Sequence, residues 1–293
     1  MRHHFHTLDV FTDRGFAGNP LAVFPDAAAV PEAAMPLIAR ELNLSETVFV
    51  LPATGGGACR LRIFTPTREM PFAGHPTIGT AVLLAHLGRL PNDASILEEG
   101  VGPVPVHVRR GFAQLTAARL PEIGPPPPPR AALATILGLA PDDIVEGDVA
   151  PAVVSCGVAI LFVPLVDRRA VARARLDAHL ARPLLAPGGT GEVYVYARDP
   201  ERPGSDLRAR LFAPELGIGE DPATGAAATT LAGYLATRLP QPDGQFRWTI
   251  EQGFEMGRPS LLFSEADKSQ GRVTATRVGG HAVRMSEGDF DIP

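Results

Sequence analysis

The chain has 293 residues, of which 45% are hydrophobic and 20% charged, which is the composition of an ordinary globular protein. Its length suits two domains of about 145 residues each. The net charge of −5 gives no electrostatic reason to bind nucleic acid or an anionic membrane.

The N-terminal segment is rich in histidine. It carries Arg2, His3, His4 and His6 before Asp9, and it has no apolar core of the kind that secretory signal peptides contain. No stretch of 18 or more apolar residues follows, so we expect no transmembrane helix and a cytoplasmic protein. We interpret the three histidines as part of a flexible terminus and expect no metal site.

Short strands, turns and two helices are predicted for the first half of the chain. Residues 31–42 carry apolar side chains at helical spacing, with Pro31 in a first-turn position. Residues 74–87 are apolar nearly all round, which is typical of a buried helix. Strand composition is found, in chain order, at residues 5–11, 21–24, 47–51, 59–64, 104–109 and 112–117.

Five consecutive prolines, Pro125–Pro129, lie near the middle of the chain. Such a run excludes helix and central strand and favours polyproline II. We interpret it as a stiff connector, and a ligand for an SH3-type domain is the alternative. The predicted organisation is an N-terminal lobe over residues 1–124, to which the C-terminal strand can return, a connector over 125–130 and a C-terminal lobe over 131–293.

The second half repeats this mixture of elements. Strands are predicted at residues 153–163, 192–196 and 207–212, helices at 170–185 and 222–239, and closing strands at 246–251, 260–263 and 272–278. The order is not regular enough for a doubly wound parallel sheet. We therefore predict an α+β fold in which mostly antiparallel strands wrap one long buried helix in each lobe.

Two stretches of the chain look like one unit used twice. Arg62-Ile63-Phe64-Thr65-Pro66 precedes Gly74-His75-Pro76, and Arg210-Leu211-Phe212-Ala213-Pro214 precedes Asp221-Pro222-Ala223-Thr224-Gly225. A strand-like segment that opens on a glutamate, Glu46 or Glu192, lies upstream of each. The offsets between the copies are 146 to 148 residues, about half the chain. We predict two pseudo-symmetric lobes that face each other across a cleft, with His75 and Asp221 at equivalent places.

Both repeated turns precede a predicted helix, where unpaired backbone N–H groups and a partial positive charge favour anions. Two such turns can hold a small acidic substrate from both sides. His75 and Asp221 supply a different titratable group to each turn, although each also reads as a helix cap. Glu46, at the edge of an apolar strand, can transfer protons if burial raises its pKa. A solvated turn residue is the alternative, and Glu192 is its competitor.

Few other residues point to chemistry. Asn19, in the Gly18-Asn19-Pro20 turn, can offer an amide to a carboxylate, but a structural role in the turn fits the residues better. Cys59 and Cys156 have no neighbouring histidine in sequence, and we interpret them as small buried hydrophobic residues. The chain contains no phosphate-binding loop and no nucleophile elbow.

At these residues the chain resembles the PhzF family, the phenazine-biosynthesis-like isomerases and epimerases. The resemblance covers essentially the whole chain. Its motifs are Asp9-Val10-Phe11-Thr12, Phe16-Ala17-Gly18-Asn19-Pro20, Leu44-Ser45-Glu46-Thr47, Gly74-His75-Pro76-Thr77-Ile78-Gly79, Gly219-Glu220-Asp221-Pro222-Ala223-Thr224-Gly225, and Gln252-Gly253 through Met256-Gly257-Arg258-Pro259-Ser260. The family has the diaminopimelate-epimerase-like fold, with two pseudo-symmetric lobes that each wrap a central helix, which agrees with the repeat.

The resemblance implies a cofactor-independent isomerase of a small carboxylic acid. Glu46 matches the family's proton-relaying glutamate, and His75 and Asp221 match its histidine and aspartate, so these three are the expected catalytic residues. The implied substrate-binding residues are Asn19, Gly74, Pro76, Thr224, Gly225 and Ala226. Homodimers are common among the proteins that the chain resembles, so we expect a homodimer, with no nucleic-acid or membrane partner.

Two departures from the family concern the substrate and the mechanism. Ala226 stands where the phenazine enzyme has a serine, so one hydroxyl toward its substrate, dihydro-3-hydroxyanthranilate, is missing. The related amino-acid epimerases carry paired cysteines on the two turns, where this chain has His75 and Asp221. Two alternatives remain: an amino-acid epimerase, which would need Cys59 or Cys156 in the cleft, and a small-molecule binding or interaction protein that has lost catalysis.

Overall fold

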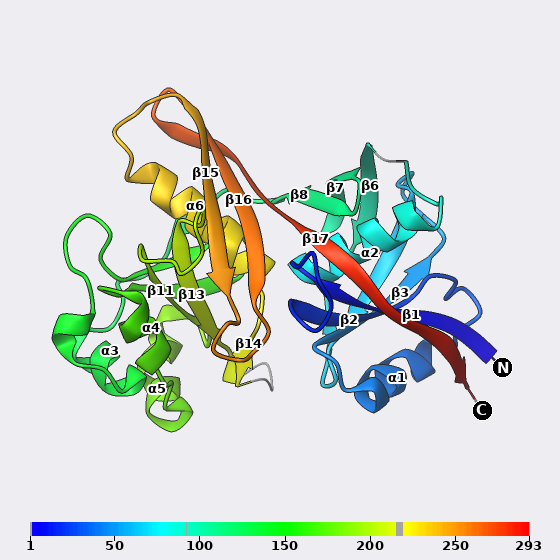
Figure 1. Ribbon diagram of the computed structural model, residues 1–293, viewed down its shortest axis with the longest axis horizontal. Helices are drawn as coiled ribbons and strands as arrows, with labels where there is room; N and C mark the ends of the chain where they lie inside the picture. Colours follow the sequence, from blue (N-terminus) through cyan, green and yellow to red (C-terminus); the bar gives the residue numbers. More distant parts are fainter. Residues whose placement is uncertain (1, 92, 215–218, 293) are drawn as a thin grey trace. The chain divides into compact units, whose positions relative to one another are not determined.

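A computed structural model describes residues 2–91, 93–214 and 219–292 (Figure 1). The chain forms two compact units, Met1–Thr116 with Gly279–Pro293, and Ala117–Val278. Strand β17 (Arg272–Asp291) begins in the second unit and ends in the first. The unit boundary therefore follows Thr116 and not residue 124, and the C-terminal strand belongs mostly to the first unit.

The proline run has a different place from the one predicted. Pro125–Pro129 lies within the second unit, between strand β9 (Glu122–Ile123) and helix α3 (Arg130–Leu137). Strand β9 pairs with a strand of the second unit, so the chain has already entered that unit before the prolines begin. The run joins two elements of one unit and does not connect the two units.

The N-terminal segment is not a flexible terminus, and that interpretation was wrong. Residues Arg2–Val10 form strand β1, which pairs with β17 on one side and with β2 (Asn19–Phe24) on the other. His3 and His6 are buried. The segment is ordered by a partner strand from the far end of the chain, which no local pattern in the first ten residues can reveal.

The first unit is a closed ring of strands around one helix. Its further elements are a 3₁₀ turn (Glu32–Ala34), α1 (Met35–Leu42), β3 (Glu46–Leu51), β4 (Cys59–Phe64), β5 (Glu69–Met70), α2 (Gly74–His86), β6 (Ala94–Glu99), β7 (Gly102–Arg109) and β8 (Phe112–Thr116). Pairing runs β17–β1–β2–β3–β4–β6–β7–β8, with β2–β3 and β4–β6 parallel. Strand β8 pairs again with β17, and this closes the ring.

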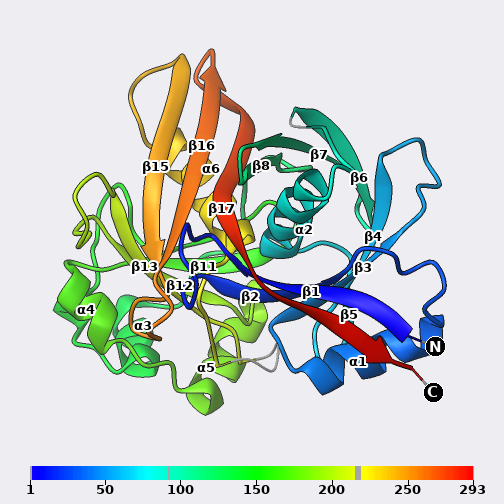
Figure 2. The same cartoon turned by 45° about the vertical axis from the view of Figure 1, so that its right-hand side comes forward.

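Helix α2 lies inside this ring (Figure 2). It packs against β1, β2, β3, β7 and β8, and every residue from Gly74 to Leu84 is buried, as the apolar sequence predicts. Close approach to the strands depends on Gly79, because a Cβ there would lie 2.6 Å from side-chain atoms of Val10 and Leu21. The ring thereby fixes the first turn of α2, which carries His75.

The second unit uses the same pairings in the same order. Its further elements are β10 (Ala152–Ser155), β11 (Ala159–Pro164), α4 (Arg168–Arg173), α5 (Ala178–Leu185), β12 (Val193–Ala197), β13 (Leu207–Phe212), β14 (Glu220–Asp221), α6 (Gly225–Thr237), β15 (Gly244–Gln252) and β16 (Ser260–Ser269), with 3₁₀ turns at Pro141–Asp143 and Ala186–Gly188. Pairs β11–β12 and β13–β15 are parallel, and β10–β11, β12–β13, β13–β14 and β15–β16 are antiparallel. Helix α6 packs on β10, β15 and β16 and is buried over most of its length.

The predicted α+β class therefore holds, with one buried helix in each unit. Among the described residues, no helix is both long and apolar enough to cross a membrane.

Candidate active site

Glu46 is presented by the start of strand β3. Helix α1 ends at Leu42, and the left-handed backbone of the capping residue Asn43 (φ 50°) turns the chain into the strand. The first residue of the strand is Glu46, opposite Leu21 of the parallel neighbour β2. Its side chain is only 14% exposed. Glu46 is thus largely withdrawn from water and is not the solvated turn residue of the alternative interpretation.

Asn19 begins the neighbouring strand β2 and is fully buried. The residue before it, Gly18, has a φ of +67°, and a Cβ there would lie 2.3 Å from the carbonyl oxygen of Val10. Only glycine fits this position, because both the backbone angle and the contact exclude a side chain. The turn therefore directs Asn19 into the interior of the first unit.

His75, the second residue of α2, joins these two side chains. Its Nε2 lies 3.1 Å from Oε2 of Glu46, and its Nδ1 lies 3.2 Å from the amide nitrogen of Asn19. The imidazole is 5% exposed. Three predicted site residues from β2, β3 and α2 thus form one contiguous group, in which each ring nitrogen has a polar neighbour.

Burial lowers the pKa of His75 to about 3, although a hydrogen bond with the backbone of Pro20 opposes this effect. The imidazole is therefore neutral near pH 7, and its 3.1 Å contact with Glu46 is a close polar contact and not an ion pair. A neutral imidazole has one donor and one acceptor nitrogen. Because Nδ2 of Asn19 can only donate, Nδ1 is the acceptor and the ring proton is on Nε2, the nitrogen that faces Glu46.

A second polar group surrounds Asp221 in the other unit. Asp221 is buried at the end of β14, and the Oγ1 hydroxyl of Thr224 donates to its Oδ2. The side-chain amide of Gln252 donates to the backbone carbonyl of Asp221 at 2.8 Å and to Oγ1 of Thr224 at 2.9 Å. The Oε1 of the same amide accepts from the backbone N–H of Thr224 at 3.2 Å. Gln252 thus holds the whole turn before α6.

Gln252 is a site residue that our sequence reasoning did not select. It is itself oriented by Tyr194, whose hydroxyl donates to its Oε1 at 3.1 Å. The following Gly253 has a φ of +76°, and a Cβ there would lie 2.5 Å from the carbonyl oxygen of Pro222. The signal in the sequence was the Gln252-Gly253 pair, whose glycine allows the strand end to approach the turn.

The remaining predicted substrate-binding residues occupy the two helix starts. Gly74 and Gly225 are the first residues of α2 and α6, and both are buried. Pro76 is the third residue of α2 and has no N–H to offer, while Ala226 is the second residue of α6.

Comparison with known proteins gives the family. The phenazine biosynthesis-like protein family, PhzC-PhzF, matches residues 8–288. This chain belongs to that family. An uncharacterised isomerase of Mesorhizobium japonicum is 42% identical over 97% of both chains, and the trans-2,3-dihydro-3-hydroxyanthranilate isomerase of Pseudomonas aeruginosa is 36% identical over 98% of both chains. The crystal structure of a Bacillus anthracis phenazine biosynthesis protein of the PhzF family covers the whole of both chains with a TM-score of 0.92, at 24% identity, which shows a common fold.

The family resemblance predicted from the motifs is thus confirmed. With relatives named isomerases along its full length, this PhzF-family protein is an enzyme of the isomerase class.

The internal repeat of this PhzF-family chain has a different register from the predicted one. Arg62 makes a bidentate ion pair with Glu69, and Arg210 makes the same pair with Glu220. The arginines are 148 residues apart, but the glutamates are 151 apart. The second copy therefore carries three additional residues between its strand and its turn.

This shift overturns the equivalence of His75 and Asp221. Strand pairing places Met70 opposite Ile63 and Asp221 opposite Leu211, so Met70 is the counterpart of Asp221. Because α2 and α6 both begin on glycine, the counterpart of His75 is Ala226.

The same register argues against Glu192 as the catalytic glutamate. Glu192 precedes β12 as Glu46 begins β3, so the two remain counterparts, and Glu192 is half-buried. In the first unit, His75 presents its imidazole to Glu46. The corresponding position in the second unit is occupied by Ala226. Glu192 therefore has no histidine at the corresponding place.

A buried carboxyl of the first unit was also missed. Glu99, at the end of β6, is 7% exposed, and Oγ1 of Thr77 in the first turn of α2 donates to its Oε1 at 2.7 Å. Burial raises the pKa of Glu99 to about 8, against which the hydrogen bond from Thr77 acts. The group is thus largely protonated at pH 7.

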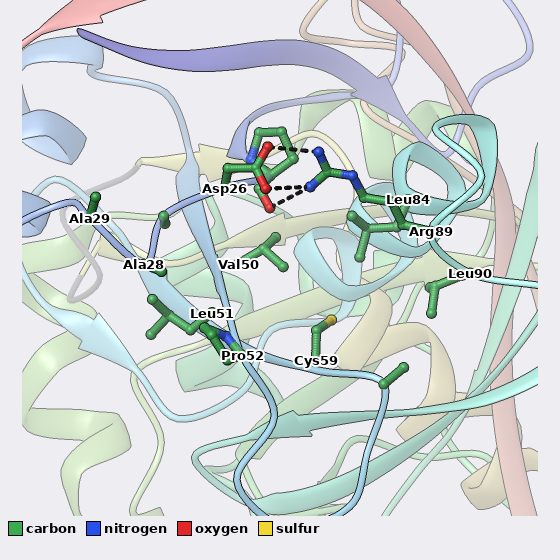
Figure 3. Close-up of a pocket in the computed structure, with 13 residues that line it drawn as sticks. Asp26, Ala28, Ala29, Val50, Leu51, Pro52, Cys59, Leu84, Arg89 and Leu90 are labelled. Carbon is green, nitrogen blue, oxygen red and sulfur yellow. Dashed lines mark hydrogen bonds and ion pairs between the residues drawn. The ribbon is translucent and has the colours of Figure 1, made fainter.

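The two cysteines lie outside both polar groups. Cys59 lines a cavity of about 410 Å³ in the first unit, beside the ion pair of Arg89 with Asp26 (Figure 3). None of Asn19, Glu46 and His75 lines this cavity. Burial raises the pKa of Cys59 to about 11 and also raises that of Cys156. Neither thiol is primed to act as a base.

Proposed function

We propose that this protein is a cofactor-independent isomerase that moves a proton between two carbons of a small, cyclic or unsaturated carboxylic acid. The observation that carries the proposal is the buried contact between Glu46 and a neutral His75, held by Asn19. A carboxylate with little access to water and a neutral imidazole beside it suits a group that must both take and return a proton.

Glu46 is the proposed acid and base. It would take a proton from a carbon that a neighbouring carboxylate or double bond makes acidic, and it would return that proton at another carbon. The neutral imidazole of His75, with its proton on Nε2, would face the Glu46 carboxylate and donate to it before the proton transfer. The pKa of about 3 keeps His75 from ionising as the proton moves.

The second polar group is proposed to act on the same substrate from the other repeat. Asp221, fixed by Thr224 and Gln252, would steer the second proton position, and the substrate carboxylate would bind backbone N–H groups at the starts of α2 and α6. Exclusion of water from the bound substrate would keep the transferred proton from being lost.

The proposed substrate class rests on the named substrate of one relative and on the alanine at position 226 of this chain. The relative from Pseudomonas aeruginosa is named for trans-2,3-dihydro-3-hydroxyanthranilate, a cyclic unsaturated acid. Ala226, the second residue of α6, offers no side-chain hydroxyl to such a substrate. We therefore propose a related acid that lacks the hydrogen-bonding partner of the family serine.

Proton exchange observed by NMR tests the proposal. The wild type and Glu46→Gln are incubated in heavy water with a panel of cyclic and unsaturated carboxylic acids, including trans-2,3-dihydro-3-hydroxyanthranilate. The expected result is isomer formation or deuterium uptake at one carbon, lost in the variant. Product formation by Glu46→Gln at the wild-type rate would remove Glu46 from the mechanism.

The two alternatives have their own tests. A two-thiol epimerase is disfavoured by the raised pKa values of both cysteines, and alkylation of Cys59 and Cys156 is expected to leave turnover unchanged. A catalytically inactive binding protein would bind an acid of the panel in calorimetry while giving neither product nor exchange. Turnover of any panel member excludes that reading.

A further inference from the structure

One face of strand β1 carries basic side chains opposite acidic ones on β17. Alternate residues Arg2, His4 and His6 lie opposite Asp291, Asp289 and Glu287 in the antiparallel register. Both strands belong to the first unit here and run side by side in Figures 1 and 2. The face contains none of the residues of the proposed function, and its chemistry does not depend on them.

Two imidazoles and one carboxylate converge on this face. Nδ1 of His6 lies 3.5 Å from Oε2 of Glu287, and Nε2 of His4 lies 3.9 Å from the same oxygen. One donor atom from each of the three side chains lies within 4.8 Å of the others. The donor set of two imidazole nitrogens and one carboxylate oxygen suits zinc and similar transition metals better than magnesium or calcium.

The burial of His6 gives an independent reason to expect a ligand. Its side chain is 3% exposed, and its Nδ1 has no hydrogen-bond partner among the described residues. A buried polar atom without a partner destabilises a folded protein, because it loses its hydrogen bonds to water. The atom faces Glu287, so a cation between the two would give Nδ1 of His6 a partner.

His4 is already oriented for metal binding. Its Nδ1 lies 3.1 Å from Oδ1 of Asp289, which leaves Nε2 directed toward Glu287 and His6. Histidines that bind metals usually have their second nitrogen fixed by a carboxylate in this way. With bonds of about 2.0–2.1 Å, tetrahedral zinc separates its ligand atoms by roughly 3.3–3.5 Å. The two imidazole nitrogens lie 3.5 and 3.9 Å from Oε2 of Glu287, so side-chain rotations must bring the three ligand atoms closer to reach these values.

We propose that His4, His6 and Glu287 form a binding site for a divalent transition metal of the zinc class. Nε2 of His4, Nδ1 of His6 and one carboxylate oxygen of Glu287 are the ligands, and Asp289 is the positioning residue. Three protein ligands leave a coordination position for water. The metal would join the first strand of the chain to the last one and thereby lock the strand ring of the first unit.

Arg284 is the feature that opposes the site. Its Nη1 donates to Oε2 of Glu287 at 3.1 Å and so competes with a cation for that oxygen. The metal must displace this contact or use the other carboxylate oxygen. Removal of Arg284 is therefore expected to tighten metal binding, whereas removal of a ligand weakens it.

Titration of the full-length, metal-free protein with ZnCl₂ and with CoCl₂ tests the proposal. We expect one equivalent of Zn²⁺ by calorimetry, visible absorption from bound Co²⁺, and no binding of Mg²⁺. His4→Asn and Glu287→Gln should each weaken binding at least tenfold, Asp289→Asn about tenfold, and Arg284→Gln should strengthen it several-fold. These four side chains are on the surface, so the variants are expected to fold, which their melting temperatures without metal will verify.

His107→Asn is the matched control, because it removes an exposed histidine from β7 of the same unit. It should bind Zn²⁺ as the wild type does. Absence of stoichiometric binding, or equal affinities in the wild type, His4→Asn and Glu287→Gln, would overturn the proposal and leave the face as a row of cross-strand charge pairs. Isomerase turnover is not a readout, so this result stays separate from the proposed function.

Discussion

The turn that leads into α2 and the turn that leads into α6 share a scaffold but differ in chemistry. The pairs Arg62–Glu69 and Arg210–Glu220 fix both turns with the same bidentate geometry. Each arginine also lies over the ring of the phenylalanine two residues later, at 5.1 and 4.8 Å. The residues that hold a turn in place are therefore repeated.

A structural glutamate is also repeated on the strands β6 and β15, which pair in parallel with β4 and β13. Glu98 of β6 accepts backbone N–H groups from Thr54, Gly55 and Gly57, and its counterpart Glu251 of β15 accepts those of Glu201 and Arg202. In both units a glutamate thus stabilises a loop by accepting from successive amides.

The side chains that face the helix starts are not repeated. Glu99 occupies the place of Gln252, His75 that of Ala226, and Met70 that of Asp221. Duplication has kept the supports of the turns and changed the groups that they present. Four substitutions test how far this division between support and chemistry holds.

The largest effect is expected from Glu46→Gln, with Glu192→Gln as its matched control. The first should lower turnover about 10³-fold or more, because removal of a general base typically loses 10²–10⁴-fold and no neighbouring carboxyl replaces it. The second should leave turnover unchanged, because the place of His75 is taken by Ala226 in that unit. Rates are measured by NMR and folding by melting temperature. Equal losses in both variants would contradict the division of roles.

Asp221→Asn tests whether the second polar group takes part in catalysis. We expect about 10²-fold lower turnover with little change in melting temperature, because the amide keeps one oxygen to accept from Thr224 but loses the charge. Substrate binding is followed in parallel by calorimetry. Wild-type turnover in Asp221→Asn would confine the chemistry to the first unit.

Glu99→Gln replaces a buried acid with the amide that the second unit uses. The Glu99 carboxyl ionises with a pKa of about 8 when folded, above its ordinary value of 4.5. Between these values the unfolded chain binds fewer protons, so the free energy of unfolding falls by about 1.4 kcal/mol per pH unit as the pH rises. The variant should lose this dependence, so its stability relative to the wild type should rise by about 2 kcal/mol between pH 6 and pH 8. Urea unfolding at pH 6 and pH 8 measures it, and parallel curves for both proteins would refute it.

Ala226→Ser is expected to have the smallest effect. It restores the family hydroxyl at the second residue of α6, where one hydrogen bond contributes about 1 kcal/mol, or roughly fivefold in kcat/KM. The increase should be specific to trans-2,3-dihydro-3-hydroxyanthranilate among the acids of the panel. A uniform change across the panel would point to an altered helix start and not to a new substrate contact.

The sequence was a good guide where the signal is local. Both buried helices are continuous apolar runs, and Glu46 and His75 lie in short motifs, so their elements could be predicted from neighbouring residues. Asn19 was expected mainly to shape a turn, whereas its side chain contacts the imidazole of His75. The difference arises because the partner of Asn19 comes from a helix more than fifty residues away.

Non-local pairings account for the failures. The second copy of the repeat has three additional residues before β14, so the two copies are offset differently before and after this point. Because the motifs were aligned with a single offset, His75 was matched with Asp221 and not with Ala226. Gln252 and Glu99 reach the helix starts from strands that pair in parallel with β13 and β4. No turn or periodicity in the sequence records such a pairing.

The return of β17 to the first unit has a consequence for synthesis of the protein. The second unit is one uninterrupted stretch, Ala117–Val278, and all its residues are synthesised before residues 279–291. The ring around α2 lacks a strand until residues 279–291 emerge, although β1 was made first. The unit that is started first is therefore the last to be completed, and until then the edges of β1 and β8 need protection from aggregation.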